Sequence, residues 1–144
     1  MTEHIERIIV GVDGSDNSKR ALEWAITLAA RSEAEVIAVH AAGLLAHIGE
    51  GAPVPSHSHR EELRAAFENV WCAPLESSGV EYRTMYMEGP PVLSLLDAAS
   101  EEEADMIVVG RRGTGGFAEL MLGSTSHQVA EHAACPVLII PPPR

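Results

Sequence analysis

The sequence has little positive charge. Its 144 residues contain ten lysines and arginines against 21 aspartates and glutamates, which gives a formal net charge of −11 at pH 7. Lys19 is the single lysine. So acidic a chain lacks the basic surface that nonspecific binding to nucleic acid or to an anionic membrane requires. It still allows a bound nucleotide, because backbone N–H groups can hold phosphates without lysine.

Cysteine and long apolar runs are also scarce. Cys72 and Cys135 are the two cysteines, and without a Cys-x-x-Cys pair they form neither a zinc ribbon nor a thioredoxin-type site. No apolar run approaches the roughly 20 residues that span a bilayer. The charged segment 1–4 lacks the apolar region of a secretory signal. We therefore expect a cytoplasmic protein with two buried, reduced thiols.

What the chain does have is enough apolar sequence for one domain, spanning 1–144, because 46% of its residues are apolar. Short β-branched runs alternate with helical patterns. The expected strands are 8–12, 36–41, 82–87, 106–110 and 136–140, with helices after each of the first four. This order predicts an α/β fold: a doubly wound, five-stranded parallel sheet with helices on both faces.

Residues 42–59 interrupt this alternation with glycine, proline and three histidines, His47, His57 and His59. We interpret them as a flexible insertion with solvated histidines, since a third metal ligand is missing beside the His-x-His pair. After it, Leu63 to Val70 carry a helical apolar stripe. Near the end of the chain, Thr125 and Gln128 have the spacing of a capping box that would begin the fourth helix.

The stretch between the fourth strand and the fourth helix carries the chemistry. It contains Gly110, Gly113 and Gly123, followed by three hydroxyl residues at 124–126. Glycines allow a close approach of backbone to a ligand, and a helix N-terminus presents N–H groups to an anion. In a doubly wound sheet this stretch shares one rim with the Asp13-Gly14-Ser15 turn. A polyphosphate fits such a rim, although a plain flexible loop with a well-capped helix would give the same pattern.

Two familiar phosphate motifs do not explain the stretch. A P-loop requires a lysine after its glycines, and Lys19 has no such glycines before it. The segment 113–118 fits G-x-G-x-x-A, but a dinucleotide fingerprint belongs beside the first strand, with an acidic residue ending the next one. Here the next strand is the last, and no acidic residue follows Glu131.

The spacing Gly110-x2-Gly113-x9-Gly123-Ser124 resembles the ATP-binding signature of the universal stress protein family. The opening 8–15 and the closing 134–140 resemble that family's first and last strands, so the resemblance covers the whole chain. It implies a Rossmann-like fold of the adenine-nucleotide alpha-hydrolase kind. The residues that it implies for nucleotide binding are Val12, Asp13, Ser15, Ala41, Gly110, Arg112, Gly113, Gly123, Ser124, Thr125 and Ser126.

The resemblance implies an ATP-binding regulator of the stress response, with Mg²⁺ between the phosphates as a compatible addition. Asp13 is the one acid that the strand pattern places on the rim. Without a base partner or a lysine clamp it gives thin support for phosphoryl transfer, so we expect slow ATP hydrolysis or none. The alternatives are an interaction module of the same fold that works without nucleotide, and a weak ATPase.

A homodimer is expected through the fifth strand. Its apolar residues should lie at an edge of the sheet, where an unpaired strand invites pairing with a second chain. Those residues are Val137, Leu138, Ile139 and Ile140. An unidentified protein partner is compatible with this arrangement.

Overall fold

The computed structural model describes residues 4–42, 57–111 and 124–143, and its centre is a five-stranded sheet. The strands are β1 (Arg7–Gly11), β2 (Glu35–Ala41), β3 (Tyr82–Met87), β4 (Met106–Gly110) and β5 (Val137–Ile140). Their order is β3-β2-β1-β4-β5 and every neighbouring pair is parallel. The predicted doubly wound parallel sheet is confirmed.

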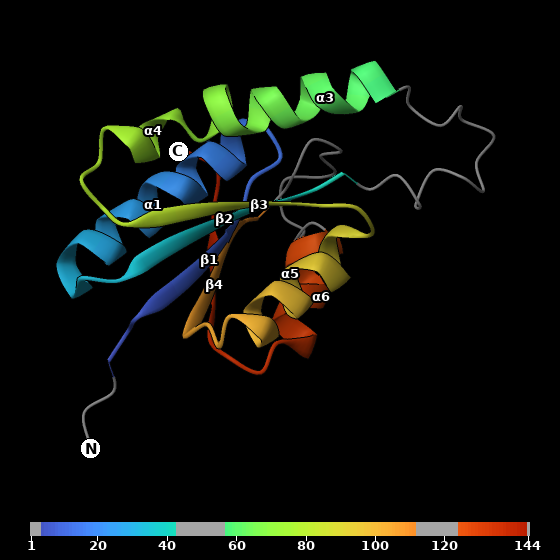
Figure 1. The fold of residues 1–144 in the computed structure, drawn as a ribbon. Helices are drawn as coiled ribbons and strands as arrows, with labels where there is room; N and C mark the ends of the chain where they lie inside the picture. The colour runs from blue at the N-terminus through green and yellow to red at the C-terminus, as the bar shows by residue number, and fades with distance from the viewer. Residues whose placement is uncertain (1–3, 43–56, 112–123, 144) are drawn as a thin grey trace.

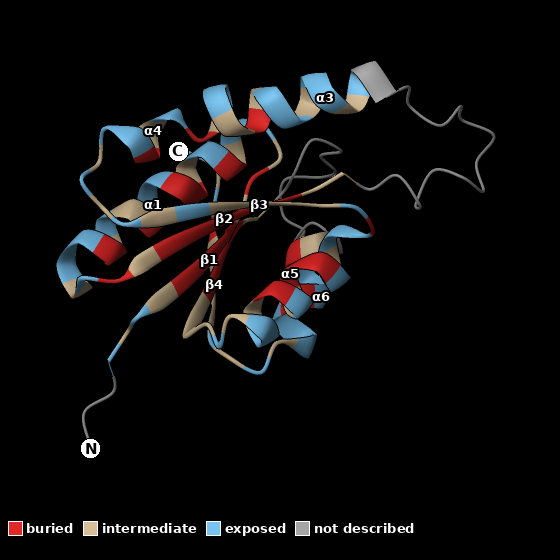
Figure 2. Ribbon diagram, viewed as in Figure 1, coloured by how far each residue is buried: buried red, intermediate tan, exposed pale blue. Residues whose placement is uncertain are grey.

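Burial explains which strands lie in the middle. β1, β2 and β4 are runs of β-branched and small residues without polar alternation, as in strands covered on both faces, and their central residues are buried. β3 has no fully buried residue and lies at one edge, while β5 lies at the other. Figure 2 shows the buried central strands between helices that are buried on their sheet-facing side.

Two groups of helices cover the two faces (Figure 1). On one face lie α1 (Asp16–Ser32), α3 (His57–Ala66), the π-helix η2 (Phe67–Trp71) and the short α4 (Ala73–Glu76). On the other lie α5 (Pro91–Glu101) and α6 (Ser124–His132). Each face has its own core cluster, and the alternating side chains of the central strands divide between them.

Two helix starts were expected differently. α6 begins at Ser124, so Thr125 already lies inside the helix and the capping box predicted for Thr125 and Gln128 is wrong. α3 begins at His57, so 57–59 are helical rather than part of the insertion, and residues 43–56 lie outside the described residues.

The helical stripe after the insertion also ends differently. Val70 was expected on the buried side, yet it is 66% exposed. The five residues of η2 are wound as a π-helix, which has more residues per turn than an α-helix. This change of period turns Val70 toward solvent, while Phe67 remains buried and Trp71 is half-buried.

Candidate functional site

The carboxyl ends of β1 and β4 form the switch point of the sheet. The chain leaves β1 to enter α1 on one face, and α6, which follows β4, covers the other face. In open α/β sheets this divergence leaves a crevice in which ligands bind. Asp13 and Ser15 follow β1, Ala41 ends β2, Gly110 ends β4, and α6 begins at Ser124. The fold therefore brings the described part of the predicted site to one rim.

Asp13 is the centre of a tightly bonded turn. Its Oδ1 accepts the backbone N–H of Ser15 at 2.9 Å and the Ser15 hydroxyl at 2.5 Å. Ser15 is the N-cap of α1 and accepts the N–H of Ser18 at 3.1 Å, while the Ser18 hydroxyl bonds back to the Ser15 carbonyl. Within the described chain Asp13 Oδ2 has no hydrogen-bond partner, and the residue is half-buried. One carboxylate oxygen of Asp13 thus fixes the turn.

His40 supports this turn from beneath. Its Nδ1 lies 2.8 Å from the carbonyl oxygen of Val12, so the neutral ring donates Nδ1–H to that oxygen. Phe67, Trp71 and Tyr86 surround the ring with centroids 5.2 to 5.7 Å away. Burial lowers the pKa of His40, although the Val12 bond and the nearby Asp13 charge oppose that shift. His40 is thus a buried, neutral side chain that binds the Val12 carbonyl. The backbone N–H of Val12 donates to the carbonyl oxygen of Val39 at 2.9 Å.

The first turn of α1 lies too close to Gly110 to leave room for a side chain there. A Cβ at this position would lie 2.8 Å from the backbone oxygen of Asn17 and 2.9 Å from its carbonyl carbon. Because Asn17 is in the first turn of α1, the missing side chain lets that turn pack directly on the end of β4. Gly110 therefore sets the width of the crevice, in addition to any ligand contact.

The first turn of α6 is fixed to the same rim. The hydroxyl of Ser126, which is 2% exposed, donates to the carbonyl of Arg111 at 2.9 Å. Arg111 in turn donates its backbone N–H to Ile140 at 2.8 Å. Thr125 is half-buried beside Ser126. The buried Ser126 hydroxyl thus anchors the helix start to β4, and the backbone N–H groups of the first turn are those that α6 itself cannot pair.

Of the remaining predicted site residues, the structure describes one and leaves three undescribed. Ala41 is half-buried at the end of β2, opposite Met87 of β3. Three lie outside the described residues, namely Arg112, Gly113 and Gly123. On α6, His127 faces Glu131 one turn along the helix, with Nε2 3.2 Å from Oε1.

Comparison with known proteins identifies the family of this chain. The family model described as the universal stress protein family matches residues 4–141. The chain belongs to the universal stress protein family. The universal stress protein YxiE of Bacillus subtilis is 35% identical to it, over 93% of this chain and 97% of that protein.

Solved universal stress proteins share the whole fold. One, in complex with cAMP, is 29% identical with a TM-score of 0.67, over 96% of this chain and 98% of that one. UspA from Lactobacillus plantarum is 26% identical with a TM-score of 0.75, over 96% and 99%. The predicted adenine-nucleotide alpha-hydrolase-like fold is confirmed.

The sequence signature of this universal stress protein missed one part of the neighbourhood. Gly14 has φ +83°, and a Cβ on it would lie 2.7 Å from two atoms of the Trp71 indole. The indole therefore packs closely against the turn that carries Asp13. The signal in the sequence was a glycine in a turn, but nothing local pairs it with a residue 57 positions later.

The described ranges also bear on metal, membrane and thiol chemistry. Among those residues no three His, Cys, Asp or Glu side chains gather as metal ligands would. No helix described in this universal stress protein combines the length and hydropathy needed to cross a membrane. Burial raises the pKa of the Cys72 thiol to about 12 and also raises that of Cys135, so neither thiol is activated as a nucleophile.

Proposed function

We propose that this universal stress protein binds an adenine nucleotide, ATP above all, in the crevice between the Asp13 turn and the start of α6. One observation carries the proposal. Ser15 binds Asp13 through Oδ1 only, so Oδ2 would be able to accept hydrogen bonds from ribose hydroxyls. A relative of the same fold is in complex with cAMP, which contains adenine, ribose and phosphate.

The roles follow from the positions along the rim. Asp13 would accept ribose hydroxyls, and Ala41 would lie against the adenine base at the end of β2. The N–H groups of the first turn of α6, together with Gly113 and Gly123, would hold the phosphates, with Arg112 beside them. A phosphate site made of backbone suits a chain of net charge −11, because N–H groups and the helix dipole attract an anion without lysines.

The nucleotide would act as a regulatory ligand in the stress response. Among the described rim residues Asp13 is the carboxylate nearest the proposed ribose, and His40 is engaged with Val12 rather than available as a base. This arrangement favours binding with slow hydrolysis or none. Mg²⁺, if present, would take its oxygens chiefly from the phosphates and water, with Asp13 Oδ2 as the available carboxylate ligand.

The test is Asp13→Asn, measured by isothermal titration with ATP. Asparagine keeps an oxygen for the Ser15 N–H and replaces the charged Oδ2 by an amide. Loss of a hydrogen bond to a charged group costs about 1.5–3 kcal/mol, so ATP affinity should fall about tenfold or more. The matched control is Asp97→Asn, an exposed carboxylate on α5, on the opposite face. Equal affinity of Asp13→Asn and the control would refute the assigned site.

Nucleotide choice and turnover separate this function from its alternatives. Titration with ATP, ADP, GTP and cAMP should show a preference for adenine, and native mass spectrometry should show ATP bound to the purified protein. A chain that binds none of the four would be the interaction module that works without nucleotide. Phosphate release well above background that Asp13→Asn abolishes would make it an ATPase.

We further propose a homodimer through β5. The strand lies at an open edge, and Val137, Leu138 and Ile139 are half-buried in the single chain. Antiparallel pairing with a second copy would satisfy that edge, and the prolines at 141–143 would limit its length because they lack N–H donors. Sedimentation at micromolar concentration should give about twice the chain mass, and a monomer would contradict the proposal.

A further inference from the structure

A cavity of about 430 Å³ lies between α1 and the η2–α4 segment. It opens on the sheet face that α1 covers and borders the Asp13 turn through Gly14 and Ser15. Ala41 and the start of α6, where we place base and phosphates, do not line it. Its volume is in the range of about 300–1,000 Å³ that small-molecule sites occupy. The cavity is thus large enough for a ligand of its own.

One wall of the cavity is apolar and partly aromatic. Val70, Trp71 and Pro74 form it, and Val12 closes the end nearest the sheet. Val70 and Trp71 of the π-helix η2 both line this space, and Val70 is also 66% exposed to solvent. π-Helical turns inside helices are frequent at functional sites. The wall offers a flat indole on which a planar apolar group can lie.

The opposite wall carries one charge of each sign. Asp16 and Lys19, three residues apart on α1, both line the cavity. This spacing permits an ion pair on a helix, but in the described part of the chain neither residue forms one within 4.0 Å. Both charges are therefore available to a ligand that carries the opposite pair.

We propose that this cavity binds a free aromatic amino acid. Its carboxylate would pair with Lys19, its ammonium group with Asp16, and its ring would lie on Trp71. An anion alone would meet the repulsion of Asp16 and a cation alone that of Lys19, whereas a zwitterion complements both. The ring requirement follows from the indole and the apolar side chains on the facing wall. The cavity shares Val12 and Ser15 with the residues expected to bind nucleotide, whereas Asp16, Lys19 and Trp71 belong to the cavity alone. The proposed recognition rests on these last three residues and not on a bound nucleotide.

The experiment is a titration of the full chain with L-phenylalanine in the absence of nucleotide. A Trp24→Phe background leaves Trp71 as the only tryptophan, so its fluorescence reports the cavity. Trp24 is 47% exposed on α1, so the fold should tolerate its replacement. L-Phenylalanine should give a saturable change. Isothermal titration of the unmodified chain checks the same affinity without the background variant.

Three analogues test the chemistry of recognition. 3-Phenylpropionate lacks the ammonium group, 2-phenylethylamine lacks the carboxylate, and L-alanine lacks the ring. Each should bind about tenfold more weakly than L-phenylalanine, because each forfeits one charged pairing or the stacked ring. Equal binding of 3-phenylpropionate or of 2-phenylethylamine would overturn recognition of a zwitterion. Equal binding of L-alanine would overturn the role of Trp71.

Variants complete the test. Lys19→Met and Asp16→Asn should each weaken L-phenylalanine about tenfold. The matched control Glu23→Gln removes an exposed charge one turn further along α1 and should leave the affinity unchanged. Circular dichroism establishes that all three fold. Absence of saturable binding to the unmodified chain, or an equal loss in Glu23→Gln, would overturn the proposal. A loss of ATP binding in Asp13→Asn bears only on the nucleotide crevice.

Discussion

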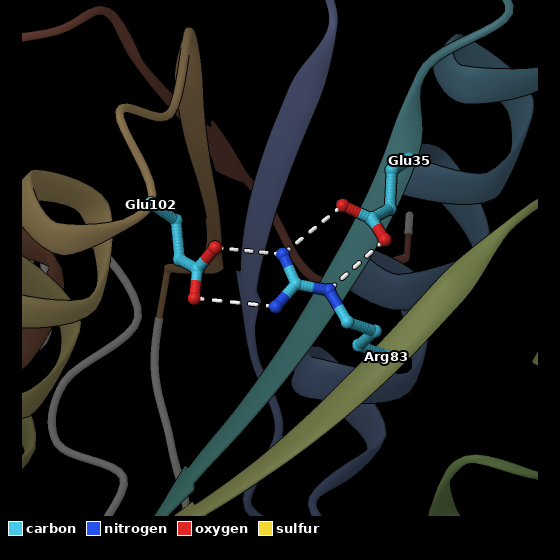
Figure 3. A network of polar contacts seen from close by, with 3 residues as sticks. All are labelled: Glu35, Arg83 and Glu102. Carbon is cyan, nitrogen blue, oxygen red and sulfur yellow. Dashed lines mark hydrogen bonds and ion pairs between the residues drawn. The ribbon is translucent and has the colours of Figure 1, made fainter.

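The two ends of the sheet differ in how their charged and polar groups are paired. At the amino end, Arg83 at the start of β3 lies between two carboxylates (Figure 3). Its guanidinium donates to Glu35 at 3.0 and 3.1 Å and to Glu102 at 2.7 and 3.3 Å. Nearby, Asp105 Oδ2 accepts the N–H groups of Glu6 and Arg7. Here the charged groups pair with one another and with the backbone.

At the carboxyl end the described polar groups are only partly used. Asp13 commits one oxygen to its own turn, and the first turn of α6 leaves N–H groups that the helix cannot pair. His40, the titratable group beneath them, is held neutral by burial. Among the described residues, the charged groups at the amino end of the sheet are paired with one another, whereas polar groups at its carboxyl end are only partly paired.

The largest expected effect tests how the carboxyl end is assembled. Gly110→Ala would place a methyl group 2.8–2.9 Å from the backbone of Asn17, so the start of α1 must move away from β4. We expect the free energy of unfolding to fall by about 1–3 kcal/mol, as overpacking usually costs. Urea denaturation measures it.

The matched control is Gly11→Ala at the end of the neighbouring β1. There the added Cβ would meet the side chains of Leu95 at 3.4 Å and Val109 at 3.5 Å, which are ordinary contacts. This variant should be within about 1 kcal/mol of the parent protein, in either direction. If the two variants cost the same, close packing of α1 on β4 does not set the width of the crevice.

The next prediction concerns the neutral support beneath the Asp13 turn. Burial lowers the pKa of His40 below its ordinary value of about 6.5. The unfolded chain therefore takes up a proton as the pH falls below that value, while the folded chain resists it. Stability from this group is present above about pH 6.5 and is lost below it, by at most about 1.4 kcal/mol per pH unit.

His40→Asn keeps a donor for the Val12 carbonyl and removes the titration. The loss of ring contacts with Phe67, Trp71 and Tyr86 lowers stability at every pH, so the readout is the slope. Urea unfolding between about pH 7.5 and 5.5 should be less pH-dependent in this variant than in the parent or in His127→Asn, an exposed control. Parallel slopes in all three would show that His40 is not held neutral.

The fold could be predicted from sequence because each signal was local. Buried β-branched runs such as Met106–Gly110 indicate strands wherever they occur, and the crossovers between them require parallel pairing. Local signals failed where the helical period changed. Val70 fits an α-helical stripe, and nothing in its neighbours announces the π-helix that exposes it.

The residues of the candidate site that lie in turns could be predicted from the sequence. Asp13 and Ser15 were expected on the rim, and the structure places them in one bonded turn. The packing of Gly110 on Asn17 and of Gly14 on Trp71 joins distant segments, which one sequence does not pair. Likewise Glu102 binds Arg83 of another element, and no local signal pairs these two residues.

The smallest expected effect is that of replacing Arg83, which tests whether paired charges stabilise the amino end of the sheet. Hydrogen bonds from Arg83 lower the pKa of Glu102, and the same bonds raise the pKa of Arg83. The side chain of Arg83 is 46% exposed, so water screens the attraction. Arg83→Met should therefore cost only about 0.5–1 kcal/mol at neutral pH, although it leaves Glu35 and Glu102 facing each other without a cation.

The lowered pKa of Glu102 predicts how the effect of Arg83→Met on stability changes with pH. Because the pKa of Glu102 is lowered in the folded chain, its contribution is present above the ordinary glutamate value of about 4.3 and is lost as the pH falls through the folded pKa. The stability difference between the parent and Arg83→Met, measured by urea unfolding, should shrink from pH 7 toward pH 3 and also in about 1 M salt. Arg31→Met, an exposed position in the last turn of α1, is the control and should show neither trend. A difference that persists at low pH would mean that Arg83 acts through packing of its stem, and the amino end would then not be closed by charge.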